Sequence, residues 1–321
     1  MSLTPDAAST LRRALATAVV VPVTPYQADG APDWDTYAAL ITRLIDGGIS
    51  VITPNGNTGE FYALSPAEAR QALETAAKVA SGRAEVLAGV GHDIATAIEA
   101  ARHAQDHGAR MVMIHQPVHP YVSAEGWIDY HAAIADAVPD LGVVLYIRDE
   151  RRTGHQIAQL VERSPNVIGV KYGVRDATRF AAVARDAVAR DAVARAAGAR
   201  VAGLDRLTWL AGAAELTAPA FWAVGARGFT SGLANVSPAL ALGMLDALRR
   251  NDFQEAMRKW EAARRFEELR LADGSADNVS VVKEALAQLG LCRADVRPPS
   301  RALPDTIKNE IAGILQGWSI A

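Results

Sequence analysis

Eight short apolar runs alternate with longer helical patterns along most of this 321-residue chain. Most of the runs are continuously apolar, which is typical of parallel strands covered on both faces. Eight strand–helix repeats of this size predict a (β/α)8 (TIM) barrel of the α/β class. The strands are expected at residues 18–23, 50–54, 85–91, 111–115, 143–147, 167–172, 207–212 and 228–232.

An open, doubly wound sheet is the alternative fold, and it is weakened because no G-x-G-x-x-G follows the first strand. The seventh strand is the least defined, since the sequence pattern of residues 200–204 is an alternative to residues 207–212 for this strand. Residues 185–197 carry a short five-residue repeat. We interpret this segment as an extension of the preceding helix with a charged, solvated face.

About 70 residues follow the eighth repeat, and they contain three helical patterns, at residues 252–271, 279–290 and 304–318. We therefore expect a barrel over residues 1–250 that carries the functional site. Residues 251–321 are expected to form a helical appendage packed on the barrel.

Charge and cysteine content exclude several classes of protein. A net charge of −3 gives no reason to expect nucleic acid or an anionic membrane as a partner. Cys292 is the single cysteine, so a disulfide framework and a thiolate metal cluster are excluded. No stretch reaches the apolar length of a membrane helix, and residues 1–14 lack an apolar signal core. We expect a cytoplasmic protein.

Lys171 is an unusual residue, because it ends the apolar run at residues 167–172. A buried ammonium is costly unless it is paired or has a lowered pKa, and a lysine with a lowered pKa attacks carbonyl carbons. A core lysine held by a carboxylate is the alternative. The chain has only five lysines, and the other four are predicted on solvated helix faces: Lys78, Lys259, Lys283 and Lys308.

Two further strand ends carry candidate groups. After the second strand, Gly56, Asn57 and Thr58 form a glycine-rich loop whose N–H groups and side chains suit a carboxylate, with a plain turn as the alternative. Tyr146 ends the fifth strand and is suited to proton transfer, or else it is an aromatic residue at the rim. Gly169 lies one layer below Lys171, which favours space for a ligand.

Histidines at the ends of strands three and four suggest a metal site as another possibility, through His92, His115 and His119. No His-x-His pair is present and acidic neighbours are few, so we expect no metal. His119 is better suited to polarising a carbonyl or hydroxyl group of a substrate.

Together these motifs resemble the dihydrodipicolinate synthase / N-acetylneuraminate lyase family over nearly the whole chain. The motifs are Val21-Pro22-Val23-Thr24-Pro25, Gly56-Asn57-Thr58-Gly59-Glu60, Gly89-Val90-Gly91, Tyr146 with Arg152-Thr153-Gly154, Gly169-Val170-Lys171 and Gly228-Phe229-Thr230-Ser231. The resemblance implies a barrel with a C-terminal helical region and a homo-oligomer, either a tetramer or a dimer. It also implies a Schiff base between Lys171 and pyruvate or another 2-oxo acid, with no cofactor beyond this covalent imine. Tyr146 would move protons, and residues 56–58 would hold the carboxylate of the 2-oxo acid.

Three departures from the synthases leave the substrate open. Asn57 replaces the first of two threonines, and Val118-His119 stands where synthases have a tyrosine pair. Tyr146-Ile147-Arg148-Asp149 is similar to the 5-dehydro-4-deoxyglucarate dehydratases of the family. Arg148 or Arg152 would bind a second carboxylate of the substrate, or else both are surface arginines. Thr230 is expected to contact the substrate. The reaction is then aldol cleavage, condensation or dehydration. A non-catalytic 2-oxo acid-binding protein is the alternative of another class.

Overall fold

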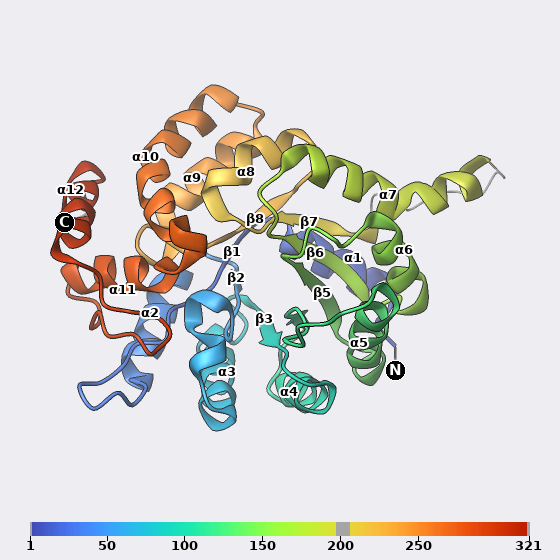
Figure 1. The fold of residues 1–321 in the computed structure, drawn as a ribbon, viewed down its shortest axis with the longest axis horizontal. Helices are drawn as coiled ribbons and strands as arrows, with labels where there is room; N and C mark the ends of the chain where they lie inside the picture. Colours follow the sequence, from blue (N-terminus) through green and yellow to red (C-terminus); the bar gives the residue numbers. More distant parts are fainter. Residues whose placement is uncertain (1, 197–205, 320–321) are drawn as a thin grey trace.

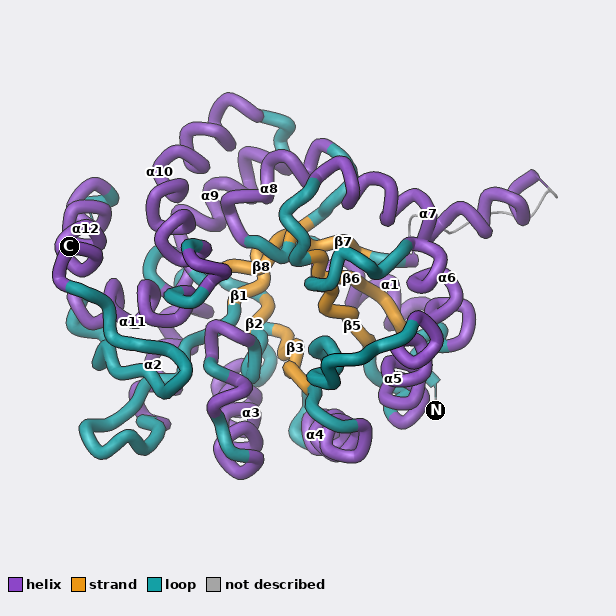
Figure 2. Tube along the Cα trace, in the orientation of Figure 1, coloured by secondary structure: helices purple, strands orange, loops and turns teal. Residues whose placement is uncertain are grey.

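The computed structural model describes residues 2–196 and 206–319. Eight parallel strands close into a barrel in sequence order, and helices surround it (Figures 1 and 2). The predicted TIM barrel is therefore confirmed. The strands are β1 (Ala18–Val20), β2 (Val51–Ile52), β3 (Glu85–Val90), β4 (Met111–Ile114), β5 (Gly142–Ile147), β6 (Val167–Tyr172), β7 (Thr208–Ala211) and β8 (Gly228–Ser231).

All eight predicted strands are present, each within a few residues of its expected bounds. The seventh lies within residues 207–212, and the competing residues 200–204 fall outside the described part of the chain. The predicted helical extension after β6 is also present, because α7 (Ala177–Ala196) runs on to Ala196 and projects beyond the ring of helices (Figure 1).

Six of the seven remaining barrel helices begin after a residue whose side chain caps them, and α8 is the exception. Ser65 forms a capping box with Glu68 at the start of α3, which has proline in its first turn. The helices are α2 (Trp34–Asp46), α3 (Pro66–Ala80), α4 (Ile94–Asp106), α5 (Ala124–Ala137), α6 (Gly154–Arg163), α8 (Ala214–Ala223) and α9 (Pro238–Arg249). None of the helices among the described residues is both long and apolar enough to cross a membrane.

An N-terminal helix that the sequence did not reveal, α1 (Pro5–Leu15), contributes to the core inside the barrel. Its Leu11 and Leu15 pack in one buried cluster with Val19, Val144 and Leu210. This helix corrects the interpretation of Gly169. A Cβ at that glycine would lie 3.2 Å from Leu15 Cδ1, so the space below Lys171 is filled by α1 and holds no ligand.

The three predicted C-terminal helices are present as α10 (Phe253–Leu271), α11 (Asn278–Gln288) and α12 (Asp305–Gly317). Helix α10 packs against α8 and α9, and α11 reaches the short 3-10 helix η1 (Asn57–Gly59) that follows β2. The C-terminal region thus lies along one side of the barrel (Figure 1) and contacts the loop after β2 directly.

Candidate active site

The carboxyl ends of the strands surround a cavity of about 750 Å3. Catalytic sites of TIM barrels lie at this end of the barrel. Six of the residues predicted from the sequence line the cavity: Asn57, Thr58, Tyr146, Arg148, Lys171 and Thr230. Gly56, His119 and Arg152 are not among the residues that line it.

Lys171 projects from the end of β6, and only 4% of its surface is exposed. Burial, followed by the positive charges of Arg148 and Arg270, lowers the pKa of this amine to about 7. No described carboxylate contributes to this shift, so the structure does not support a core lysine held by an acid. At neutral pH a large fraction of Lys171 is the free amine, which is the nucleophilic form.

Tyr146 lies beside Lys171, because the two residues are partners in the register between β5 and β6. Burial raises the pKa of the Tyr146 phenol, so the hydroxyl keeps its proton at neutral pH. That hydroxyl accepts a long hydrogen bond of 3.4 Å from Asn57 Nδ2. The arrangement places a proton donor between the amine and the loop after β2.

The loop after β2 turns at residues other than its glycines. Its left-handed residues are Asn55 (φ 61°) and Glu60 (φ 60°), whereas Gly56 has a φ of −90°. Gly56 is needed for close packing, since a Cβ there would lie 2.5 Å from Val21 Cγ1. This tight contact sets the position of Asn57 and Thr58 at the cavity.

Glu60 ties the same loop to the C-terminal region. Its carboxylate pairs with Lys283 Nζ on α11 and accepts a 2.8 Å hydrogen bond from the Arg297 N–H. Lys283 also donates to the Asp295 carbonyl and lies over the ring of Tyr26. The prediction that Lys283 lies on a solvated helix face is therefore wrong, because its side chain is fully buried.

The two arginines after β5 have different surroundings. Arg148 lines the cavity, and its charge contributes to the lowered pKa of Lys171. Arg152 is buried and donates to the Asp149 carboxylate and the Ser123 carbonyl. It therefore holds the loop after β5 against the start of α5.

The histidines do not assemble a metal site at the barrel mouth. His115 is buried, its Nε2 bonds to the Asn55 carbonyl, and burial lowers the pKa of its imidazole to about 3. His119 is exposed, and its Nδ1 contacts the backbone of Tyr121. Within residues 2–196 and 206–319, the one group with metal-ligand spacing is Glu74, His103 and His107, on α3 and at the end of α4.

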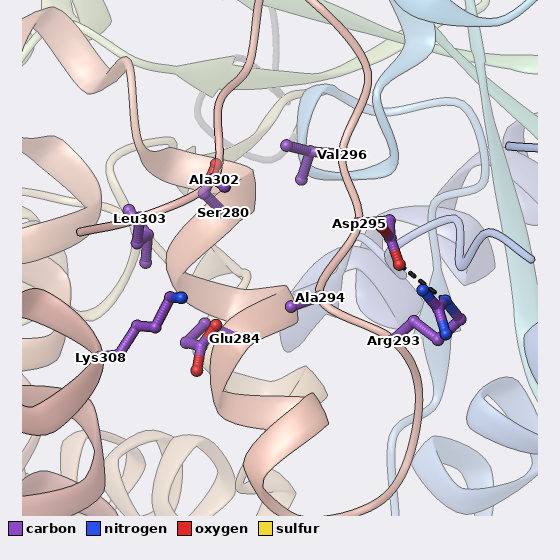
Figure 3. A pocket seen from close by; sticks show the side chains of 9 residues that line it. All are labelled: Ser280, Glu284, Arg293, Ala294, Asp295, Val296, Ala302, Leu303 and Lys308. Carbon is purple, nitrogen blue, oxygen red and sulfur yellow. Dashed lines mark hydrogen bonds and ion pairs between the residues drawn. The ribbon is translucent and has the colours of Figure 1, made fainter. Parts of the chain in front are cut away.

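Thr230 reaches the cavity from the end of β8, and its hydroxyl donates to the Gly212 carbonyl at 3.4 Å. A second cavity, of about 420 Å3, lies in the C-terminal region between α11 and the segment that leads to α12 (Figure 3). Glu284 and Lys308 line it together with the Arg293–Asp295 ion pair. None of the residues predicted for the functional site lines this second cavity.

Sequence reasoning missed a group of buried charges on the wall of the main cavity. Glu267 and Arg270 of α10 pair with each other, and both line the cavity with Ser231. Ser231 donates in turn to the carboxylate of Glu215, which is also fully buried. Glu267 and Arg270 stand one helical turn apart in an otherwise charge-rich helix, so their sequence pattern resembles an exposed ion pair.

The model of the dihydrodipicolinate synthetase family matches residues 14–317. The chain belongs to this family. Membership supports an enzyme of the lyase kind, and the barrel with its C-terminal helices agrees with the resemblance drawn from the sequence motifs.

Both a synthase name and a dehydratase name occur among relatives in the dihydrodipicolinate synthetase family. A 4-hydroxy-tetrahydrodipicolinate synthase of Phenylobacterium zucineum is 30% identical over 92% of this chain and 94% of its own length. A protein of Rhizobium rhizogenes named "Probable 5-dehydro-4-deoxyglucarate dehydratase" is 29% identical over 92% of both chains. The solved dihydrodipicolinate synthase of Bacillus clausii has a TM-score of 0.88 and 38% identity, over 96% of this chain and 99% of that one.

Proposed function

We propose that this protein is a lyase that forms a Schiff base between Lys171 and the ketone of a 2-oxo acid. The observation that carries the proposal is the state of Lys171. It is a buried amine with a pKa near 7, without a described carboxylate partner, at the wall of a cavity at the carboxyl end of the barrel. Pyruvate, as the simplest 2-oxo acid with a ketone, is the reference ligand.

The proposed reaction begins when the free amine of Lys171 attacks the ketone carbon and forms a carbinolamine. The Tyr146 hydroxyl supplies the proton with which the carbinolamine hydroxyl leaves as water, which leaves an iminium on Lys171 and a phenolate at Tyr146; the phenolate regains its proton from the neighbouring carbon or from solvent. The resulting iminium withdraws electrons from the neighbouring carbon. A C–C or C–O bond at the carbon after that neighbouring carbon is then broken or formed. Water finally releases the product from Lys171.

The carboxylate of the 2-oxo acid is assigned to the loop after β2. Thr58 and Asn57 line the cavity there and offer a hydroxyl and an amide donor. Asn57 has no hydroxyl, so in this proposal it orients Tyr146 through the Nδ2 contact and does not pass a proton itself.

Reductive trapping tests the proposal. The protein is incubated with pyruvate and borohydride and then weighed by mass spectrometry. We expect one reduced pyruvate adduct on the wild-type chain and none on Lys171→Ala, while Lys78→Ala, which changes an exposed lysine, is trapped like the wild type. Absence of an adduct, or an adduct that persists in Lys171→Ala, would exclude the Schiff-base lyase.

A sugar-acid dehydratase is the second candidate for the same imine chemistry. Arg148, in the Tyr-x-Arg-Asp sequence after β5, lines the cavity with Lys171, and several relatives carry the dehydratase name. A turnover screen should include 5-dehydro-4-deoxyglucarate, other 3-deoxy-2-oxo sugar acids, and pyruvate with aspartate semialdehyde. Turnover of any of them removes the non-catalytic binding protein as an alternative, and the preferred substrate decides between dehydratase and aldolase or synthase.

A further inference from the structure

The outer ring of helices carries three potential metal ligands that the proposed imine chemistry does not use. Glu74 lies on α3, His103 lies on α4, and His107 caps the end of α4. The two helices lie side by side (Figures 1 and 2). One carboxylate oxygen of Glu74 and one nitrogen of each imidazole all lie within 4.8 Å of one another. None of the three residues lines the active-site cavity.

The two histidines share one face of α4. His103 and His107 are four residues apart, so both imidazoles project from the same side of the helix. Their ring centroids are 4.2 Å apart. Two histidines at this spacing on a helix are a recurrent zinc-binding pair, because one ion can bond to both rings. Glu74 approaches from the neighbouring helix, so a metal ion bound by all three residues would join α3 to α4.

The contact between Glu74 and His103 is close and incomplete. Glu74 Oε1 lies 3.2 Å from His103 Nε2, yet this nitrogen is buried and makes no hydrogen bond to any described residue. With zinc–ligand bonds of about 2.0–2.2 Å, neighbouring ligand atoms of a tetrahedral site are roughly 3.3–3.6 Å apart. The two atoms already lie close to this separation. A metal ion would therefore satisfy a buried nitrogen that the protein itself leaves unpaired.

His107 is held in a tautomer that can bind a metal. Its Nδ1 lies 2.8 Å from the His103 carbonyl. A carbonyl oxygen only accepts hydrogen bonds, so Nδ1 carries the proton, and the lone pair of the neutral ring is on Nε2. Metal-binding histidines usually donate their other ring N–H to a carbonyl or carboxylate in this way.

A salt bridge one helical turn away positions the same two helices. Arg70 of α3 pairs with Glu99 of α4. Arg70 precedes Glu74 by four residues, and Glu99 precedes His103 by four, so the salt bridge and the cluster lie on the same helix faces. The ligands are thus carried by helices that are already held together, which favours a defined site.

We propose that Glu74, His103 and His107 bind a divalent transition-metal ion of the zinc class, with water as the fourth ligand, and that this ion links α3 to α4. Two imidazoles and one carboxylate suit Zn²⁺, whereas Ca²⁺ and Mg²⁺ take oxygen ligands. The site lies outside the active-site cavity, so it is a second site, separate from the proposed lyase reaction.

Titration with the metal alone tests the proposal, because it requires no substrate. The whole protein is treated with a chelator, dialysed, and titrated with Co²⁺, and Zn²⁺ is then added as a competitor. We expect one Co²⁺ per chain with the visible absorption of a tetrahedral site. One equivalent of Zn²⁺ should displace it, with a dissociation constant in the micromolar range or lower.

His107→Gln is the first variant, because His107 is exposed and its replacement should not disturb folding. We expect it to bind Zn²⁺ at least tenfold more weakly and to lose the tetrahedral absorption of Co²⁺. Glu74→Gln, on the other helix, should have the same effect. His155→Gln is the matched control, since His155 is exposed on α6, and it should bind both metals as the wild type does.

Stability supplies a second measurement. Zn²⁺ should raise the urea unfolding midpoint of the wild type and of His155→Gln, and it should raise that of His107→Gln much less. Absence of saturable binding of one ion per chain in the micromolar range would overturn the site and leave Glu74 and His103 as an ion pair between helices. Binding of unchanged strength in both His107→Gln and Glu74→Gln would place the metal elsewhere and would likewise overturn it.

Discussion

The Lys171 amine lies over the face of the Tyr146 ring, with Nζ 4.1 Å from the ring centroid, while the Tyr146 hydroxyl reaches Asn57. Register pairing between β5 and β6 produces this arrangement. The aromatic ring and the hydroxyl of Tyr146 thus have separate roles. The ring packs against the amine and stabilises its charged form, and the hydroxyl is available for proton transfer.

Replacing Tyr146 by Phe separates these roles. We expect Tyr146→Phe still to form the Lys171 adduct in borohydride trapping, because the ring remains, but at a lower rate, because the proton donor for loss of water is gone. Turnover should fall by about 10²–10⁴-fold, the usual contribution of a positioned general acid or base. Tyr121→Phe is the control, since Tyr121 is largely exposed on the loop after β4. Full turnover in Tyr146→Phe would contradict a role for the hydroxyl.

The pH dependence of imine formation should report the pKa of Lys171. The amine must be unprotonated to attack, so the rate of trapping should decrease as the pH falls through about 7. Arg148→Met removes a positive charge that disfavours the ammonium, which raises the pKa of Lys171. The acid limb should then move to higher pH by roughly half a unit to one unit.

The control for this profile is Arg151→Gln, because Arg151 is exposed and paired with Asp149, and it does not contribute to the lowered pKa of Lys171. An acid limb at the same pH in Arg148→Met and the wild type would show that Arg148 does not influence the amine.

Local patterns in the sequence were sufficient to predict the barrel and part of the candidate active site. Continuous apolar runs predicted all eight strands, and in a barrel the strand ends meet, so Lys171, Tyr146 and Thr58 were expected together. The structure brings these three residues to one cavity. Helix α1 was missed because its polar face, with Arg12 and Arg13 in the last turn, obscured the leucines that enter the barrel.

Buried charges could not be predicted, because their partners are far apart in the sequence. Lys283 pairs with Glu60 from 223 residues away, and no local pattern marks it. Glu215 and Glu267 likewise come together only after α10 packs on α8. A charged residue in a helical pattern is predicted to be exposed to solvent unless its buried partner is known. Which residue becomes that partner is determined only by the fold.

Gly56→Ala tests the packing of the loop after β2. The added Cβ would lie 2.5 Å from Val21 Cγ1, so either the loop or Val21, the residue after β1, must shift. We expect a loss of roughly 1–3 kcal/mol in the free energy of unfolding and weaker binding of pyruvate. Val21→Ala should restore part of both in the double variant. An unchanged unfolding midpoint and unchanged pyruvate binding in Gly56→Ala would refute this packing role.

Lys283→Met should be strongly destabilising, because it leaves the buried Glu60 carboxylate without its cationic partner. Breaking one side of a buried ion pair costs about 3–5 kcal/mol. Urea unfolding should show this loss, and Glu60→Gln in the same chain should recover much of it. Lys308→Met removes a lysine paired with a highly exposed aspartate, Asp305, and should change the stability by less than about 1 kcal/mol.

Glu215→Gln should change how stability depends on pH. Folding raises the pKa of Glu215 from 4.5 to about 8, so the folded state binds a proton that the unfolded chain releases. The stability linked to this proton is fully present below pH 4.5 and is lost as the pH rises towards about 8. Glutamine mimics the protonated acid, so urea unfolding midpoints should increasingly favour the variant over the wild type across this range. Glu261→Gln, at an exposed position of α10, should show no such trend. A difference between Glu215→Gln and the wild type that stays constant with pH would mean that Glu215 is ionised in the folded protein.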